Sequence, residues 1–234
     1  EHLQQAVAPP AKTTHQTPAT QWLLKTDNPE CLAAFEPGDF DRLRELILVV
    51  RPDNGKQLLD ALESAKLRPF ADRVRLALPT IVRARERQPL RQCVARLREA
   101  GWKRWMLPNL HGRRLLEEPL PPAHSSLGLS ADWPLYALNR FAVRELLSMG
   151  FESVTLSPED DRENLLALVS EFREKAVVVA YQDTPLMITE ACPWPENTPD
   201  CTGHRPEEEH GDTLESTDGQ SFRLMTRAGR AVLI

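Results

Sequence analysis

The residues of this sequence best suited to bind a metal lie close together near its end. Cys192, Cys201, His204 and His210 fall within 19 residues that also carry several prolines. Two thiolates and two imidazoles are enough for a tetrahedral zinc site, and two thiolates supply half of the ligands of an iron–sulfur cluster. The spacing matches no standard zinc-finger pattern. Three alternatives therefore stay open: a zinc site, an iron–sulfur cluster completed by ligands outside this chain, or a loop whose cysteines bind nothing.

A second group of reactive side chains is suited to acid–base chemistry. Asp132 and Glu159 are candidates for a catalytic carboxylate pair, and His111 is a candidate proton carrier. Glu159 also has a structural explanation, because it follows Ser157-Pro158 at the expected start of a helix, where negative charge offsets the helix dipole. The sequence contains no HExxH, P-loop or dinucleotide-binding motif, and no serine or cysteine peptidase triad is apparent.

Alternating strands and helices would position these side chains. Short apolar runs such as residues 46–50 end at turn residues, and a stretch with helical periodicity follows. Alternation of this kind favours a parallel sheet with right-handed crossovers. We therefore predict an α/β fold: a partial TIM-like (β/α) barrel of about six strand–helix units, with a C-terminal loop and a short β-hairpin. The expected barrel strands are 46–50, 74–78, 105–107, 127–130, 153–156 and 175–181.

The predicted barrel gives the candidate residues a common location. In β/α barrels the functional groups gather at the carboxyl ends of the strands. Asp132, Glu159 and His111 all follow predicted strands. Near Asp132, the aromatic side chains of Trp133 and Tyr136 are placed either to stack on a flat substrate or base, or to fill the core beneath the barrel mouth.

The chain divides into three predicted segments. Residues 1–42 carry four prolines before position 30 and little apolar periodicity, which indicates a linker or the end of an upstream domain. Residues 43–190 contain the partial barrel. Residues 191–234 contain the cysteine-bearing loop and a hairpin with strands near 221–225 and 230–234. Because the last residues have the pattern of an apolar strand, we expect a piece of a longer protein, whose upstream domains are its partners.

The overall charge of −5 gives no general attraction to nucleic acid. Residues 83–114 are different, since they carry ten Lys or Arg against two Glu. This stretch is either a solvated helix flank or an RNA contact through Arg83, Arg85, Arg87 and Arg91. Four cysteines are too few for a disulfide scaffold, and no apolar run approaches the roughly 20 residues that span a bilayer. We therefore expect a cytoplasmic protein without membrane contact.

Three segments together carry a resemblance to a known family. They are DWPLYALN at 132–139, TLSPE at 155–159, and PLM at 185–187 followed by Cys192-Pro193. In this combination the chain resembles, over about residues 125–225, the closing half of the collagenase-like (U-thirty-two) peptidase family. The resemblance implies a barrel-type fold. It also implies a family that is classed as peptidases, although several members are iron–sulfur proteins that hydroxylate RNA bases or ubiquinone precursors.

The resemblance also implies a place within a longer protein. Long members that resemble the ribosomal-RNA hydroxylation protein have barrel-like segments on both sides of a middle domain, and this chain is similar to the C-terminal one. We expect such a segment to act in RNA base hydroxylation or as part of a peptidase-family protein, and not to be catalytic alone. The alternative is a non-catalytic scaffold that binds RNA or protein. Hydrolysis of gelatin or casein would indicate a true peptidase, which we do not expect.

Overall fold

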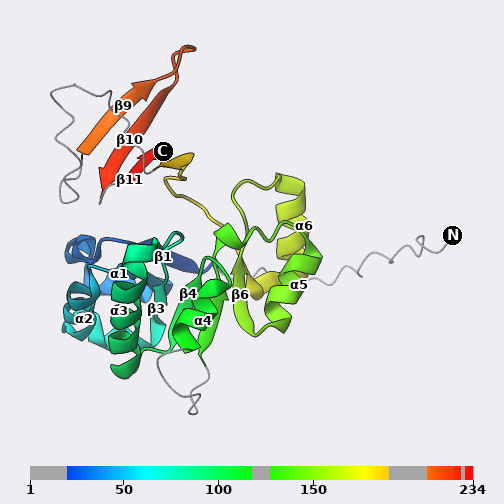
Figure 1. The fold of residues 1–234 in the computed structure, drawn as a ribbon. Helices are drawn as coiled ribbons and strands as arrows, with labels where there is room; N and C mark the ends of the chain where they lie inside the picture. The colour runs from blue at the N-terminus through cyan, green and yellow to red at the C-terminus, as the bar shows by residue number, and fades with distance from the viewer. Residues whose placement is uncertain (1–19, 118–126, 190–209, 228–229, 234) are drawn as a thin grey trace. The chain divides into compact units, whose positions relative to one another are not determined.

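A curved sheet of seven parallel strands forms the first of two structural units, residues 1–178 (Figure 1). The structure is a computed structural model and describes residues 20–117, 127–189, 210–227 and 230–233. Each strand pairs with the next in the chain, which is the strand order of a β/α barrel. The predicted α/β class and partial TIM-like barrel are confirmed. The strands are β1 (Trp22–Thr26), β2 (Leu43–Val49), β3 (Val74–Ala77), β4 (Arg104–Leu107), β5 (Gly128–Ala131), β6 (Phe151–Thr155) and β7 (Ala176–Val177).

Helices connect successive strands and cover one face of the sheet (Figure 1). Local sequence signals set several helix starts. The side-chain oxygen of Asn139 accepts hydrogen bonds from the backbone N–H groups of Phe141 and Ala142, both at 3.0 Å, and so caps the helix that begins at Arg140. The α-helices are α1 (Pro37–Asp41), α2 (Gly55–Glu63), α3 (Arg87–Glu99), α4 (His111–Glu117), α5 (Arg140–Ser148) and α6 (Arg162–Phe172). The short 3-10 helices are η1 (Pro29–Ala34), η2 (Arg68–Arg73), η3 (Ala84–Glu86), η4 (Trp133–Leu135) and η5 (Arg173–Lys175).

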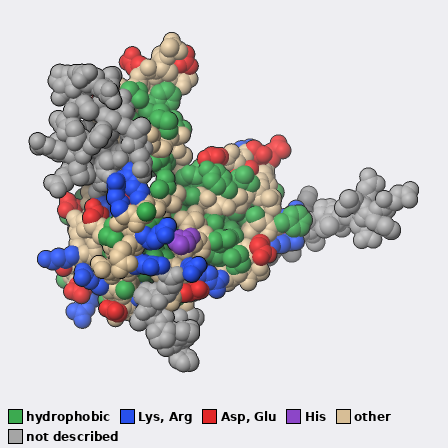
Figure 2. All heavy atoms as spheres, viewed as in Figure 1, with side chains coloured by type: hydrophobic (Ala, Val, Ile, Leu, Met, Phe, Trp, Pro, Cys, Tyr) green, Lys and Arg blue, Asp and Glu red, His purple; other side chains and the backbone are tan. Residues whose placement is uncertain are grey.

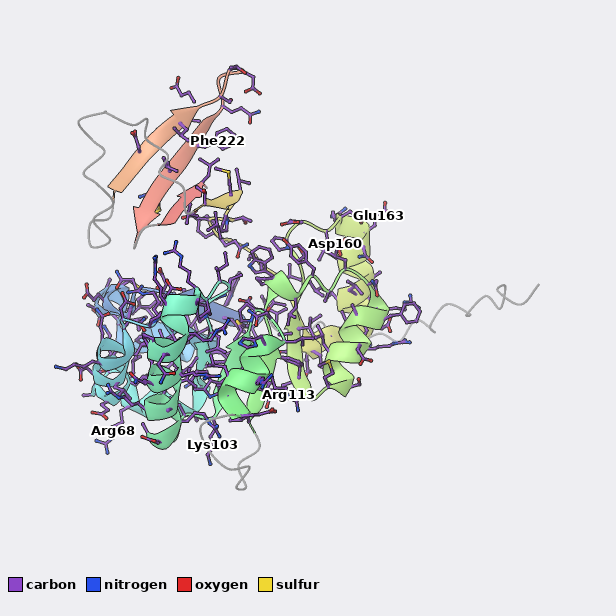
Figure 3. The ribbon with its side chains drawn as sticks, viewed as in Figure 1. Arg68, Lys103, Arg113, Asp160, Glu163 and Phe222 are labelled. Atoms are coloured by element: carbon purple, nitrogen blue, oxygen red, sulfur yellow. The ribbon has the colours of Figure 1, made fainter. Side chains whose placement is uncertain are left out.

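Helix α6 begins later than the sequence suggested. Its N-cap is Asp161, whose carboxylate accepts the backbone N–H of Asn164 at 2.8 Å. Ser157 instead accepts the backbone N–H of Glu159 in the turn before the helix. Asp160 and Glu163 lie at the start of α6 (Figure 3), where their charge still offsets the helix dipole.

The main core lies between the sheet and its helices. Strand β3 is buried at all four positions, because helices cover one side and the concave side of the sheet also excludes solvent. On α3, Leu90, Val94 and Leu97 recur at helical spacing and are fully buried. Each leucine buried to this extent contributes about 2 kcal/mol of hydrophobic stabilisation.

The concave face has its own layers of side chains. A small apolar cluster contains Ile47, Ala77 and Met106 from neighbouring strands. Toward the amino ends of the strands, the guanidinium of Arg75 donates to Glu45 at 2.7 Å and to Glu152 at 2.9 Å.

Further contacts tie this ion network into the sheet. Arg104 donates to Glu45 at 2.5 Å, and Arg75 also donates to the carbonyl oxygens of Trp105 and Gly128. Burial alone would raise the pKa of Glu45, but the hydrogen bond and charge of Arg75 outweigh it and lower that pKa. The network therefore forms a polar layer on the concave face, on the amino-terminal side of the apolar cluster.

The structure corrects two boundaries that the sequence suggested. Residues 22–26 form strand β1, paired with β2, so they belong to the barrel sheet and not to a linker or the end of an upstream domain that runs to residue 42. The expected last strand, 175–181, is paired only at 176–177. Just beyond the paired residues, Val178 and Tyr181 are exposed.

The second unit, residues 179–234, contains a four-stranded antiparallel sheet with the order β8-β11-β10-β9. The predicted hairpin strands correspond to β10 (Ser221–Arg227) and β11 (Arg230–Leu233), which pair antiparallel. The short β8 (Met187–Thr189) and β9 (His210–Glu215) were not expected. A tight turn from Ser216 to Gln220 joins β9 to β10, and Gly219 has a φ of 81° there, a conformation that favours glycine.

None of the helices in the ranges that the structure describes is both long and apolar enough to cross a membrane.

A close contact between α2 and α3 gives a first testable prediction. A Cβ atom on Gly55 would lie 2.7 Å from the Sγ atom of the buried Cys93. Gly55→Ala should therefore lower the free energy of unfolding by about 1–2 kcal/mol, although alanine is the better helix former. Chemical denaturation would measure this. In the Gly55→Ala, Cys93→Ala double variant, the loss should be smaller than the sum of the two single losses; strict additivity would show that the contact is not strained.

Candidate functional site

A buried ion pair lies where β5 ends. The carboxylate of Asp132 accepts from the ammonium of Lys25 at 2.5 Å and from the backbone N–H of Trp133 at 2.9 Å. The Asp132 side chain is only 3% exposed, whereas that of Lys25 is 37% exposed. Lys25 belongs to β1 and Asp132 follows β5, so the pair joins two strands that are not neighbours. It can do so only because the sheet curves, and it therefore spans the concave face near the carboxyl ends of the strands.

Ser130 lies next to this pair on the same face of β5. Its partners in the parallel register are Met106 on β4 and Ser153 on β6. Met106 belongs to the concave apolar cluster, so Ser130 points into the concave side as well. Ser130 is 1% exposed, and its hydroxyl has no hydrogen-bond partner among the residues that the structure describes. A buried hydroxyl without a partner is costly, which calls for an explanation.

An aromatic corner follows Asp132. Tyr136 closes the short helix η4 with a φ of 50°, a left-handed conformation that is uncommon outside glycine and often found at functional sites. Its ring packs edge-on against Trp133 with centroids 5.9 Å apart, and its hydroxyl lies 3.4 Å from a carboxylate oxygen of Glu159. Tyr136 is 49% exposed. The corner therefore presents an aromatic face to solvent.

The three candidate catalytic residues have different surroundings. Asp132 is buried with Lys25, and Glu159 is exposed beside Tyr136. The contacts described for the two carboxylates thus go to other partners and not to each other. His111 begins α4 and is exposed. All three follow strands at the carboxyl end of the sheet, as expected, but their catalytic roles remain predictions.

Lys25 is not among the candidate residues of the sequence analysis, because the pattern of residues 1–42 predicts a linker or the end of an upstream domain. The available signal was the run Trp22-Leu23-Leu24 just before it, which is long enough for a short edge strand. A lysine at the carboxyl end of such a strand has its ammonium near the barrel mouth.

The candidate metal ligands lie outside the described residues or at their edge. Cys192, Cys201 and His204 lie outside them, and His210 begins β9 with a side chain that is not described. Within the described ranges, no three His, Cys, Asp or Glu side chains are arranged to hold a metal ion. The zinc and iron–sulfur alternatives therefore stay predictions.

Some of the basic side chains of residues 83–114 form ion pairs within the fold. Arg104 is tied to Glu45, and Arg113 donates to Glu117 at 3.0 Å. Others are exposed, among them Arg85 on η3 and Arg87 at the start of α3. Figure 2 shows Lys and Arg side chains gathered around a histidine over α3 and α4. This basic face is the structural counterpart of the charge excess in the sequence.

The comparisons with known proteins identify no family for this chain. No protein-family model and no curated protein matches the sequence. One solved structure, that of the CutC copper homeostasis protein from Streptococcus agalactiae, aligns with a TM-score of 0.44 and 12% identity. The alignment covers 67% of this chain and 84% of that one. A similarity of this size says nothing about function, and the class that the strands and helices define is a partial β/α barrel.

Proposed function

We propose that this chain is a barrel segment of a collagenase-like (U-thirty-two) peptidase family protein, and that it binds RNA at the carboxyl ends of its strands for a base-modifying reaction. The observation that carries the proposal is the contact between Tyr136 and Glu159. These residues come from two of the three family-like segments, DWPLYALN and TLSPE, and are 23 positions apart in consecutive strand–helix units. Their meeting at an exposed aromatic corner is what a shared binding site would require.

RNA fits the chemistry of this corner. Aromatic side chains stack on unpaired bases whatever the sequence, because every base has a π face. Arg85 and Arg87 lie in the connection that leaves the carboxyl end of β3 and starts α3. They therefore follow a strand at the same end of the sheet as Tyr136. Exposed arginines there can contact phosphates, which a chain of net charge −5 would otherwise repel.

Peptide hydrolysis has less support. Cys93 is buried, and this burial raises its pKa to about 11, so that its nucleophilic thiolate form is scarce at neutral pH. Base hydroxylation would draw on an iron–sulfur cluster, for which Cys192 and Cys201 remain the proposed ligands within this chain. The half-barrel residues would then bind and orient the RNA.

RNA binding by the aromatic corner can be tested by fluorescence anisotropy with a labelled single-stranded 12-mer at low salt. Tyr136→Ala should weaken binding about 5- to 150-fold, because loss of one stacked base costs about 1–3 kcal/mol. Trp22→Ala is the matched control, since Trp22 is 54% exposed at the opposite, amino end of β1. The proposal fails if the RNA does not bind, or if the two variants lose affinity equally.

The exposed arginines favour a second candidate, a non-catalytic RNA scaffold held by charge. In that case the Arg85→Glu, Arg87→Glu variant would weaken binding strongly and flatten the salt dependence of the binding that is left, while Tyr136→Ala would bind as the unaltered chain does. The same anisotropy experiment therefore separates the two candidates.

A further inference from the structure

We infer that Lys25, Asp132 and Ser130 form a subsite for a neutral group that presents a hydrogen-bond donor beside an acceptor, such as a lactam, amide or ureide. The subsite lies on the concave face of the sheet. It goes beyond the proposed function, because it does not require that the ligand be RNA.

The first argument is the unused hydroxyl of Ser130. It is buried on the concave side, two residues before Asp132 on the same face of β5. Alanine at this position would avoid the cost of burying an unpaired polar group. A ligand atom that bonds to this hydroxyl would offset that cost, as is common where a protein trades stability for binding.

The second argument is the direction of access. Toward the amino ends of the strands, the concave side holds the ion network of Arg75, Glu45, Arg104 and Glu152 and the small apolar cluster. At the carboxyl end, the Lys25 side chain is 37% exposed, whereas Asp132 and Ser130 are buried. Lys25 is therefore the member of the subsite that solvent reaches, and a ligand would approach along its side chain.

The third argument concerns charge. Asp132 is fixed by the Trp133 N–H, whereas its bond to Lys25 is the one that can open. The pair is neutral as a whole, so a bound ion of either sign would leave a net charge in a largely buried place. A neutral ligand avoids this: its N–H donates to Asp132, and its carbonyl oxygen accepts from the Lys25 ammonium. Both protein charges then keep a partner.

The prediction can be tested by NMR of protein labelled with carbon-13 at the methionine methyl groups. Met106 reports on the site, because it is the register partner of Ser130, and Met149 at the end of α5 is an internal control. The neutral lactam 2-piperidone should shift the Met106 signal saturably, with a Kd on the order of 1 mM for so small a ligand. Piperidinium and acetate, which match only half of the site each, should not shift it at the same concentration.

Two variants make the result decisive. Ser130→Ala should weaken lactam binding about 2- to 10-fold, the usual worth of one neutral hydrogen bond, while the protein stays at least as stable. Ser148→Ala, on the exposed side of α5, should leave binding unchanged. The inference is wrong if the lactam does not shift Met106, if the charged probes bind equally well, or if Ser130→Ala binds unchanged. None of these results depends on the RNA-binding assay, so the two proposals can fail separately.

Discussion

Arg75→Met is expected to lower the free energy of unfolding by about 3–5 kcal/mol, the usual cost of breaking a buried ion pair. Arg75 is 1% exposed and bonds to Glu45, Glu152 and two backbone carbonyl oxygens. Its removal leaves Glu45 with Arg104 as its remaining ion-pair partner and takes the Arg75 donor from both carbonyl oxygens. Urea denaturation followed by circular dichroism would measure the loss.

Two controls can separate the effect of an unpaired buried charge from the effect of lost side-chain packing in the Arg75 network. Arg104→Met should cost about 1 kcal/mol, because the Arg104 side chain is 32% exposed and water can replace part of its contact. The Arg75→Met, Glu45→Met double variant should recover most of the loss, since the two charges that lose a partner, Glu152 and Arg104, are 53% and 32% exposed and can be solvated. If the double variant is as unstable as Arg75→Met alone, packing and not charge accounts for the effect.

The same network sets a pH dependence. Because the pKa of Glu45 is lowered from its ordinary value of 4.5 in the folded chain, its contribution to stability is present above about pH 4.5. It is lost as the pH falls through the lowered folded-state pKa, where the carboxylate is protonated. The pH profile of unfolding should therefore show less acid sensitivity in the Arg75→Met, Glu45→Met variant than in the unaltered chain.

Lys25→Met has the second large effect, a loss of about 2 kcal/mol in the free energy of unfolding. Asp132 is 3% exposed, so without Lys25 its carboxylate is a buried charge held only by the Trp133 N–H. The expected loss is smaller than for Arg75, because Lys25 is partly in solvent and its pair is already screened. Thermal or urea unfolding would measure it.

The Lys25→Met, Asp132→Asn double variant tests the cause of this loss. An amide keeps the bond from the Trp133 N–H and carries no charge, so this variant should regain most of the stability. Equal instability of the single and double variants would show that the Lys25 stem, and not its charge, supports β1.

The class of the fold follows from the sequence alone, because periodicity is a local property. A β-branched apolar run such as residues 46–50 fits a buried strand, and the stripe of Leu90, Val94 and Leu97 fits only a helix that packs on one face. Strong caps such as Asn139 also lie within a few residues of the groups they bind. Local signals of this kind are enough to predict six of the seven parallel strands.

The contents of the concave face depend instead on contacts between distant parts of the chain. Lys25 and Asp132 are 107 positions apart, and their pairing depends on the curvature of the whole sheet. Tyr136 and Glu159 meet because β5 and β6 are neighbours. Ser130 lies opposite Met106 and Ser153 in the sheet, and its hydroxyl has no hydrogen-bond partner within the described residues. No local pattern records such contacts, since each arises from the summed twist and register of several strands. The candidate residues can thus be predicted one at a time from the sequence, but the ion pair and the unpaired serine beside it emerge only when the sheet curves.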